Sequence, residues 1–244
     1  MDLSRISIGL AGATPLPVIE ALAPQIEAAG FRALWLNDTP DGDSLAGLAA
    51  AARVTSSLAL GTGVIPLDRR PAANILAALG DLPVDRLAIG VGTGAARHGL
   101  ALVEGAVAEL RAGTGAAIVV GALGPRMRAL AARVGDGVLL NWLTPEVAAA
   151  QRSELGEPVN TILYARTALD PRALPALQAE AARYGSYPAY AANFERIGAT
   201  PMQTTISDRA GIQRYLGAVD ELVLRVVTRE HTLEAYEEFL LAVQ

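Results

Sequence analysis

Eight short apolar runs alternate with helix-like segments along the chain, and this repeat is the feature that most constrains the fold. The runs cover residues 5–12, 33–38, 58–66, 86–94, 116–121, 137–143, 160–167 and 221–228. They are nearly continuous in apolar residues, as expected for parallel strands that are buried on both faces. The segments between them have helical periodicity and mostly short connections, which is typical of βαβ units. Eight such units that close on themselves predict an α/β fold of the (β/α)8 TIM-barrel type.

An open doubly wound sheet is the alternative to a barrel. The turn after the first strand reads GLAGATP and lacks the full G-x-G-x-x-G pattern of that fold. The expected helices cover 18–30, 45–56 with Ser44 as N-cap, 72–79, 100–112, 125–134, a segment after Thr144, and 232–243. Residues 171–216 predict a helical insert of three helices with breaks near 185–186, 198–201 and 207–208. No linker interrupts the chain, so we expect a single domain over residues 1–244.

The overall composition excludes several classes of protein. Hydrophobic residues make up 52% and charged residues 18%, so the chain has ample material for a core and does not read as disordered. A formal net charge of -5 argues against an electrostatic nucleic-acid binder. No apolar run reaches the roughly 18 residues that a membrane span needs. The first residues continue into a strand pattern and not a signal peptide, so we expect a cytoplasmic protein.

Missing residue types narrow the possible chemistry further. The sequence has no cysteine and no lysine, which excludes thiolate nucleophiles, Schiff bases and a P-loop lysine. Only His98 and His231 are present, so a histidine-rich metal centre is excluded and we predict no metal site. If the chain is an enzyme, a bound organic cofactor is expected to supply the chemistry.

The stretch AAIVVGALGPR at residues 116–126 has the layout of a phosphate site. A buried strand gives way to Gly121, Ala122, Gly124 and Pro125, and a helix pattern then begins with Arg126 in its first turn. Glycines let the backbone approach an anion, and the free N–H groups and the positive end of the helix dipole face it. Arg126 could add a bidentate contact. An ordinary βα loop with proline at the first helical position is the other interpretation.

Polar residues collect where the predicted strands end, which in a barrel is the functional face. The set is rich in glycine, amide and hydroxyl groups: Asn37, Asp38, Thr62, Gly63, Gly92, Thr93, Gly94, Gly121, Gly124, Asn141, Arg166, and Arg225 or Thr228. Such groups suit holding a flat polar cofactor better than acid–base hydrolysis. Asp38 could instead cap the following turn, and Arg69, Arg70 and His98 could lie on the surface.

Six stretches spread over nearly the whole chain read EAAGFRALWLND, AAARVTSSLALGTGVIPLDRRPA, RLAIGVGTG, IVVGALGPRMRALAARVGDGVLLNW, YPAYAANFERIG and GAVDELVLRVV. In this order they resemble the luciferase-like monooxygenase superfamily, which comprises flavin- or deazaflavin-dependent barrel enzymes. The resemblance implies a bacterial-luciferase-like barrel in which reduced FMN or coenzyme F420 lies across the carboxyl ends of the strands. It also implies a homodimer and a small-molecule substrate, with no nucleic-acid or membrane partner.

Particular residues receive roles from this resemblance. Gly121, Ala122, Gly124 and Arg126 would hold the cofactor phosphate, and Gly92, Thr93 and Gly94 would border the ring and tail. Thr62 to Val64 matches the place where the family often has a non-proline cis peptide behind the ring. Asn141 would also contact the cofactor. Asn37, Asp38 and His98 would contact the reacting end, and Arg69, Arg70 and Arg97 could serve an anionic cofactor tail.

The sequence departs from the family pattern in two places. Many relatives have a histidine near the end of the second strand, where this chain has Asn37 and Asp38. The segment between Gly94 and Ala116 is also short, whereas relatives often carry a long loop there that covers the substrate. A more open pocket would not protect reactive oxygen adducts from water. We therefore expect hydride transfer to or from a small organic substrate, with monooxygenation, a non-catalytic flavin binder and an unrelated barrel enzyme for a phosphorylated metabolite as alternatives.

Overall fold

A single parallel sheet closes on itself to form the barrel. The computed structural model describes all 244 residues. The strand order is β3-β2-β1-β9-β8-β7-β6-β5-β4, and β3 also pairs with β5, which closes the ring. The strands are β1 Ile6–Leu10, β2 Ala33–Leu36, β3 Ala59–Thr62, β4 Ile65–Pro66, β5 Leu87–Gly92, β6 Ala117–Gly121, β7 Gly137–Asn141, β8 Thr161–Thr167 and β9 Glu221–Val226. The chain is therefore a (β/α)8 TIM barrel, as the apolar runs predict.

The third predicted strand, residues 58–66, is divided into β3 and β4. The Gly63–Val64 peptide bond between them is cis, which matches the segment indicated by the family resemblance. Leu60 in β3 pairs with Leu87 of β5, and Ile65 in β4 pairs with Val91 of the same strand. The sheet thus has nine strands by hydrogen bonding but eight strand positions around the barrel.

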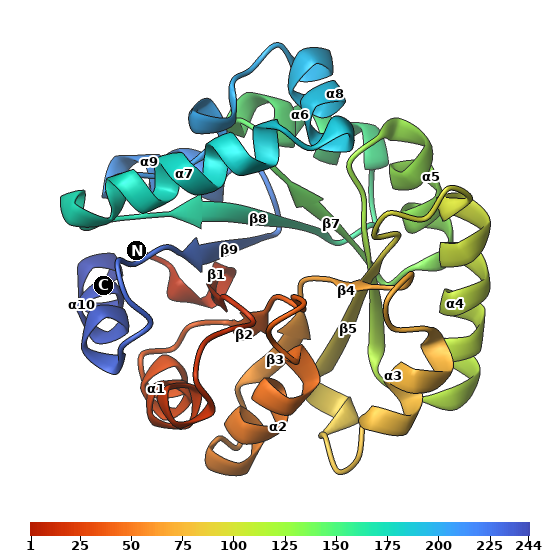
Figure 1. Cartoon of the computed structure of the whole chain (residues 1–244), viewed down its shortest axis with the longest axis horizontal. Coiled ribbons are helices and arrows are strands. Elements are labelled where there is room, and N and C mark those ends of the chain that lie inside the picture. Colours follow the sequence, from red (N-terminus) through yellow and green to blue (C-terminus); the bar gives the residue numbers. More distant parts are fainter.

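Ten α-helices follow the strands and surround the barrel (Figure 1). They are α1 Leu16–Ala28, α2 Ser44–Val54, α3 Ala72–Ala78, α4 Gly99–Gly113, α5 Pro125–Val134, α6 Pro145–Leu155, α7 Leu174–Gly185, α8 Pro188–Ile197, α9 Arg209–Leu216 and α10 Leu233–Val243. Short 3-10 turns lie at Leu3–Arg5, Val84–Arg86, Pro171–Ala173 and Pro201–Thr204. The insert before β9 contains three α-helices, and they are separated at the predicted breaks.

The predicted cap of α2 is wrong by one residue. Asp43 is the N-cap, and its carboxylate accepts hydrogen bonds from the backbone N–H groups of Leu45 and Ala46. Ser44 is the first helical residue, and its hydroxyl instead donates to Asp38 over 3.0 Å. A carboxylate is favoured at a helix N-terminus because it satisfies two free N–H groups and faces the positive end of the dipole.

Alternation along the strands separates the outer core from the interior of the barrel. In β1, Ile6, Ile8 and Leu10 belong to the large core between the sheet and the helices. A second apolar cluster fills the middle of the barrel and consists of Ala33, Trp35, Val119, Leu139, Ile162, Tyr164 and Val223. Because side chains alternate between faces, the residue two places after each of these also points inward. Beyond Trp35, Tyr164 and Val223 these positions are Asn37, Arg166 and Arg225, so polar groups line the carboxyl end.

One glycine in the outer ring is not required by the fold. Gly105 lies in the interior of α4, is exposed, and a Cβ added there would have no atom within 4 Å. We expect Gly105→Ala to stabilise the protein by about 0.5–1 kcal/mol, because alanine loses less backbone entropy in a helix. Thermal unfolding measures the change. A decrease in the melting temperature would contradict a regular, solvent-facing helix at this position.

Candidate functional site

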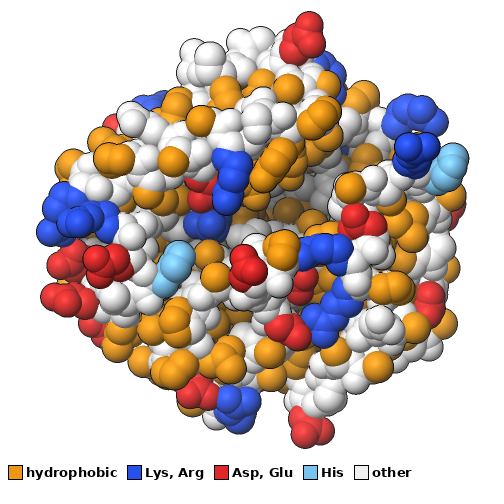
Figure 2. All heavy atoms as spheres, viewed as in Figure 1, with side chains coloured by type: hydrophobic (Ala, Val, Ile, Leu, Met, Phe, Trp, Pro, Cys, Tyr) orange, Lys and Arg blue, Asp and Glu red, His pale blue; other side chains and the backbone are white.

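A cavity of about 430 Å³ opens at the carboxyl ends of the strands. Figure 2 shows a hollow near the centre of this face, bordered by charged and apolar side chains. Ten of the thirteen residues predicted to bind the cofactor or contact the reacting end line the cavity, namely Asn37, Asp38, Gly63, Gly92, Thr93, Gly94, Gly121, Ala122, Gly124 and Asn141. The exceptions are Thr62, His98 and Arg126. The closed barrel therefore brings most of the predicted residues to one place.

The floor of the cavity is formed largely by backbone and small side chains. Gly63, Gly92 and Gly121 occupy adjacent positions of the barrel wall, and the side chain of Val64 lies between them. A Cβ added at Gly92 would come within 2.8 Å of Val64 Cγ2, and one added at Gly121 would come within 3.0 Å of Val64 Cγ1. A larger residue at either position would collide with Val64 or fill the cavity. These glycines and Val64 thus form a floor without large side chains, which we call the glycine floor.

Two arginines and one glutamate form a buried ionic cluster beside this floor. Arg166 of β8 donates to Glu180 of α7 over 3.2 Å, and Arg225 of β9 contacts the same carboxylate at 3.3 Å. The side chains are only 2%, 11% and 11% exposed for Arg166, Glu180 and Arg225. Burial alone would raise the pKa of Glu180, but the two guanidinium groups outweigh burial and hold that pKa below its usual value.

The cluster extends to both amides of the cavity. Arg225 Nε donates to Asn37 Oδ1 over 3.0 Å, and the amide nitrogen of Asn37 donates to the carbonyl oxygen of Gly63. On the other side Arg166 donates to Asn141 Oδ1. Both amides are therefore held in fixed orientations by arginines, and their remaining hydrogen-bonding capacity is available at the cavity.

Aromatic rings enclose Arg166. Its guanidinium carbon lies 4.3 Å from the centre of the Trp142 ring and 4.6 Å from that of Tyr184. Trp142 is buried and also contacts Phe194 of α8. Cation–π contacts of this kind are attractive and fix the plane of the guanidinium. The two inserted helices α7 and α8 are thus attached to the barrel through Arg166 and Trp142.

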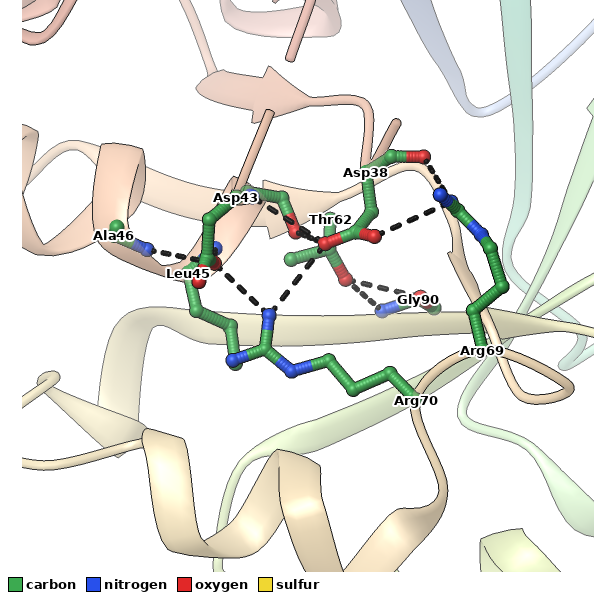
Figure 3. A network of polar contacts seen from close by, with 9 residues as sticks. Asp38, Asp43, Leu45, Ala46, Thr62, Arg69, Arg70 and Gly90 are labelled. Carbon is green, nitrogen blue, oxygen red and sulfur yellow. Dashed lines mark hydrogen bonds and ion pairs between the residues drawn. The ribbon is translucent and has the colours of Figure 1, made fainter. Parts of the chain in front are cut away.

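Asp38 lies at the edge of the cavity in a second ionic cluster (Figure 3). Arg69 donates to the Asp38 carbonyl over 3.0 Å and lies 3.4 Å from its carboxylate. Arg70 donates to Asp43 over 2.9 Å and also lies 3.6 Å from Asp38. Both arginines therefore already have carboxylate partners within the protein. A role for them in binding an anionic cofactor tail would require these ion pairs to open.

Thr62 does not contribute its side chain to the cavity. Its hydroxyl is buried, accepts a hydrogen bond from the Gly90 N–H over 2.8 Å, and donates to the Gly90 carbonyl over 3.0 Å. Figure 3 shows this contact. The reason is the alternation of a strand: Gly61 and Gly63 face the interior, so Thr62 between them faces β5 and the outside. Thr62 fixes β3 against β5, beneath the edge of the site.

His98 and Arg126 lie beside the cavity and not within it. Together with Arg97 they line a hollow of about 580 Å³ between the first turns of α4 and α5. Gly124 and Met127 border both this hollow and the central cavity. Gly124 is the N-cap of α5 and has no side chain to satisfy the free N–H groups there. The strand, glycine turn and helix start predicted at residues 116–126 are present as expected, and the turn opens toward both spaces.

The inserted helices also contribute to the cavity, which was not predicted from the sequence. Glu180, Arg183 and Tyr184 of α7, and Ala189 and Tyr190 of α8, line the cavity. The two helices α7 and α8 therefore cover one side of the cavity, even though the short connection between β5 and α4 provides no covering loop. One signal was available in the sequence, since two arginines at the ends of neighbouring interior strands require a carboxylate partner. The helical pattern alone did not indicate that α7 would bring Glu180 to them.

No group of three or more histidine, cysteine, aspartate or glutamate side chains is arranged to hold a metal ion. None of the helices combines the length and apolar character of a membrane span.

Comparison with known proteins agrees with the sequence motifs. Residues 1–114 match the family model described as luciferase-like monooxygenase, which confirms the predicted resemblance for this part of the chain. None of the curated protein sequences matches the chain. The structure also resembles solved structures at low sequence identity, and this likeness establishes the fold.

Three of these structures cover nearly the whole chain. An F420-dependent secondary alcohol dehydrogenase in complex with an F420-acetone adduct has a TM-score of 0.72 and 15% identity, covering 98% of this chain and 99% of the other. A coenzyme F420-dependent tetrahydromethanopterin reductase from Methanopyrus kandleri has a TM-score of 0.65 and 17% identity, with coverages of 90% and 92%. The FMN-bound oxygenating constituent of 3,6-diketocamphane monooxygenase from Pseudomonas putida has a TM-score of 0.61 and 11% identity, with coverages of 97% and 96%.

Proposed function

We propose that this protein is an F420- or FMN-dependent oxidoreductase that transfers hydride to or from a small organic substrate. The observation that carries the proposal is the glycine floor of the cavity, with the glycine turn at the start of α5 at its edge. A planar ring and a phosphate group need these two features side by side. The similarity to luciferase-like monooxygenases over residues 1–114 and the shared fold support the same conclusion.

The residues of the cavity fit such a cofactor. Backbone N–H groups of the Gly121–Arg126 turn, with the Arg126 guanidinium, would hold the phosphate. The side-chain amides of Asn37 and Asn141 would face the polar edge of the ring, because Arg225 and Arg166 fix both of them. The cofactor would supply two-electron hydride transfer, and the protein would bind and orient the reactants.

Asn37 and Asp38 remain our candidates for contacting the reacting end. Asn37 lies at the floor and Asp38 at the edge of the same cavity. His98 lies in the neighbouring hollow, so a role at the reacting end would require the loop before α4 to move. Hydride transfer is favoured over oxygen chemistry because α7 and α8 cover only one side of the cavity and leave it open to water. The homodimer and the cytoplasmic location stay predictions.

Cofactor binding provides the direct test. We expect FMN, F420 or both to bind with a dissociation constant well below about 100 µM, measured by fluorescence titration. For the cofactor that binds, Arg126→Gln should weaken affinity by about tenfold, since a charge-assisted contact to phosphate is lost. If that cofactor is FMN, riboflavin lacks the phosphate and should bind both proteins equally.

Arg214→Gln serves as the control, because Arg214 is exposed on α9 and lines neither space. This variant should bind the cofactors as the unmodified protein does. Failure of both cofactors to bind at about 100 µM, in a protein that unfolds cooperatively, would refute the proposed function.

A further inference from the structure

Five charged side chains line the central cavity, and four of them form ion pairs within the protein. They are Asp38, Arg166, Glu180, Arg183 and Arg225. Asp38 contacts two arginines, and Arg166 and Arg225 share Glu180. Arg183 differs from the others because its guanidinium takes part in no hydrogen bond or ion pair. All five of its N–H donors are therefore free to bind a ligand.

The position of Arg183 places it over the cavity from the side of the insert. It follows Glu180 by three residues in α7, so both lie on the same face of the helix. Its guanidinium carbon lies 5.7 Å from the centre of the Tyr184 ring, and the residue is exposed. The guanidinium of Arg183 therefore lies at the wall of the cavity that the insert forms.

The charges around the cavity leave an excess of positive charge. Three guanidinium groups face the cavity against the carboxylates of Glu180 and Asp38. Asp38 is in addition already balanced by Arg69 and Arg70 outside it. A cleft with this balance attracts anions, and a planar fork of donors favours a carboxylate.

The surroundings of Arg183 suit a ligand with a flat apolar body. The rings of Tyr184 and Tyr190 lie 4.9 Å apart in an edge-to-face arrangement at the side of the cavity. Burial, followed by the neighbouring Tyr184, raises the pKa of Tyr190 to about 12, so its hydroxyl stays neutral at physiological pH. Leu139 and Met127 add apolar surface. Aromatic rings stack well against such walls.

We propose that Arg183 binds the carboxylate of a small substrate whose flat, apolar body lies against the tyrosines of the insert, above the part of the floor that we assign to the cofactor ring. This inference rests on the proposed function, because it assigns the substrate class of the same site. It makes Arg183 a residue that determines specificity for anionic substrates.

Benzoate and its neutral counterpart benzamide test the inference without knowledge of the substrate. Isothermal titration calorimetry is carried out on the protein without cofactor and again with saturating FMN or F420. We expect benzoate to bind more tightly than benzamide. Arg183→Gln should weaken benzoate binding by about tenfold and leave benzamide binding unchanged. Arg183→Lys keeps the charge but loses the planar fork of donors, so it should weaken benzoate binding by less than Arg183→Gln does. Arg214→Gln is the matched exposed-arginine control, and neither benzoate nor benzamide affinity should change.

Three outcomes would overturn the inference. The first is that benzoate does not bind, and the second is that it binds Arg183→Gln as tightly as the unmodified protein. In the third, Arg183→Gln weakens the binding of FMN or F420 while benzoate affinity is unchanged, so that the anion held by Arg183 belongs to the cofactor.

Arg183 is exposed and unpaired, so the variants should fold with an unchanged melting temperature. The titration without cofactor separates this inference from the proposed function, since cofactor binding can fail while Arg183-dependent benzoate binding is still observed.

Discussion

Glu180→Gln is expected to destabilise the protein by about 3 kcal/mol, because it leaves two buried guanidinium groups without a carboxylate. Arg166 and Arg225 are nearly inaccessible to water and share Glu180 as their only carboxylate partner. Removing one member of a buried ionic cluster leaves the other charges uncompensated, which costs far more than the loss of a surface ion pair. For a chain of this size the melting temperature should fall by about 6–12 °C.

The same substitution should also disturb the cofactor site. Arg225 holds Asn37, and Arg166 holds Asn141, so both amides lose their fixed orientation when the cluster relaxes. The matched control is Glu195→Gln, on the exposed surface of α8 and without an ion pair. It should change the free energy of unfolding by less than about 0.5 kcal/mol. Equal stability of the two variants would contradict the structural role assigned to Glu180.

The effect of Glu180→Gln should depend on pH in a defined direction. The pKa of Glu180 is lowered in the folded protein, so its ionised form contributes stability above the ordinary pKa of a glutamate, about 4.3. That contribution disappears as the pH falls through the lowered pKa. The stability difference between the two proteins should therefore be constant from about pH 6 to 8 and should narrow below about pH 4. A difference that widens in acid would mean that Glu180 is held protonated.

Gly121→Val is expected to weaken cofactor binding by about a hundredfold, which corresponds to about 2.7 kcal/mol. Gly121 ends β6 at the floor of the cavity, and even a Cβ there would come within 3.0 Å of Val64. A valine side chain would therefore displace Val64 and change the floor on which we place the ring. Its backbone angle does not require glycine, so the variant should fold.

A control for this substitution lies at the other end of the same strand. Gly115 precedes β6 at the amino-terminal end of the barrel, and a Cβ added there would have no atom within 4 Å. Gly115→Val should leave cofactor affinity unchanged in fluorescence titration. If Gly121→Val bound FMN or F420 as tightly as the unmodified protein, the ring could not lie on the glycine floor.

The local pattern of the sequence was sufficient to predict the barrel and much of its mouth. Continuous apolar runs of β-branched and aliphatic residues form strands that must be buried on both sides, and eight of them with intervening helices have few ways to close. Because all the strands are parallel, their carboxyl ends meet at one face. Asn37, Gly92 and Asn141 were therefore predictable as neighbours, although about fifty residues separate each of them from the next in sequence.

The direction of individual side chains near the strand ends could not be predicted from the sequence in the same way. Side chains alternate between the two faces of a strand, so a shift of one residue reverses the direction of a side chain. Thr62 therefore points away from the cavity and bonds to Gly90, although it lies at the predicted end of the barrel. The division of the third strand at Gly63 and Val64 made that register hard to predict. His98 and Arg126 were also predicted at the correct end of the barrel, but the loops place them in the adjacent hollow.

By itself, the sequence determined the closed barrel, the glycine turn before α5 and the absence of cysteine and lysine chemistry, since these depend on residue type and local periodicity. Only the tertiary structure decided that α7 lies across the mouth, that Glu180 neutralises Arg166 and Arg225, and that Arg183 is left without a partner. The direction in which an amphipathic insert folds back depends on long-range packing and on the electrostatic cost of burying charge. Neither can be read from the spacing of residues within the helix.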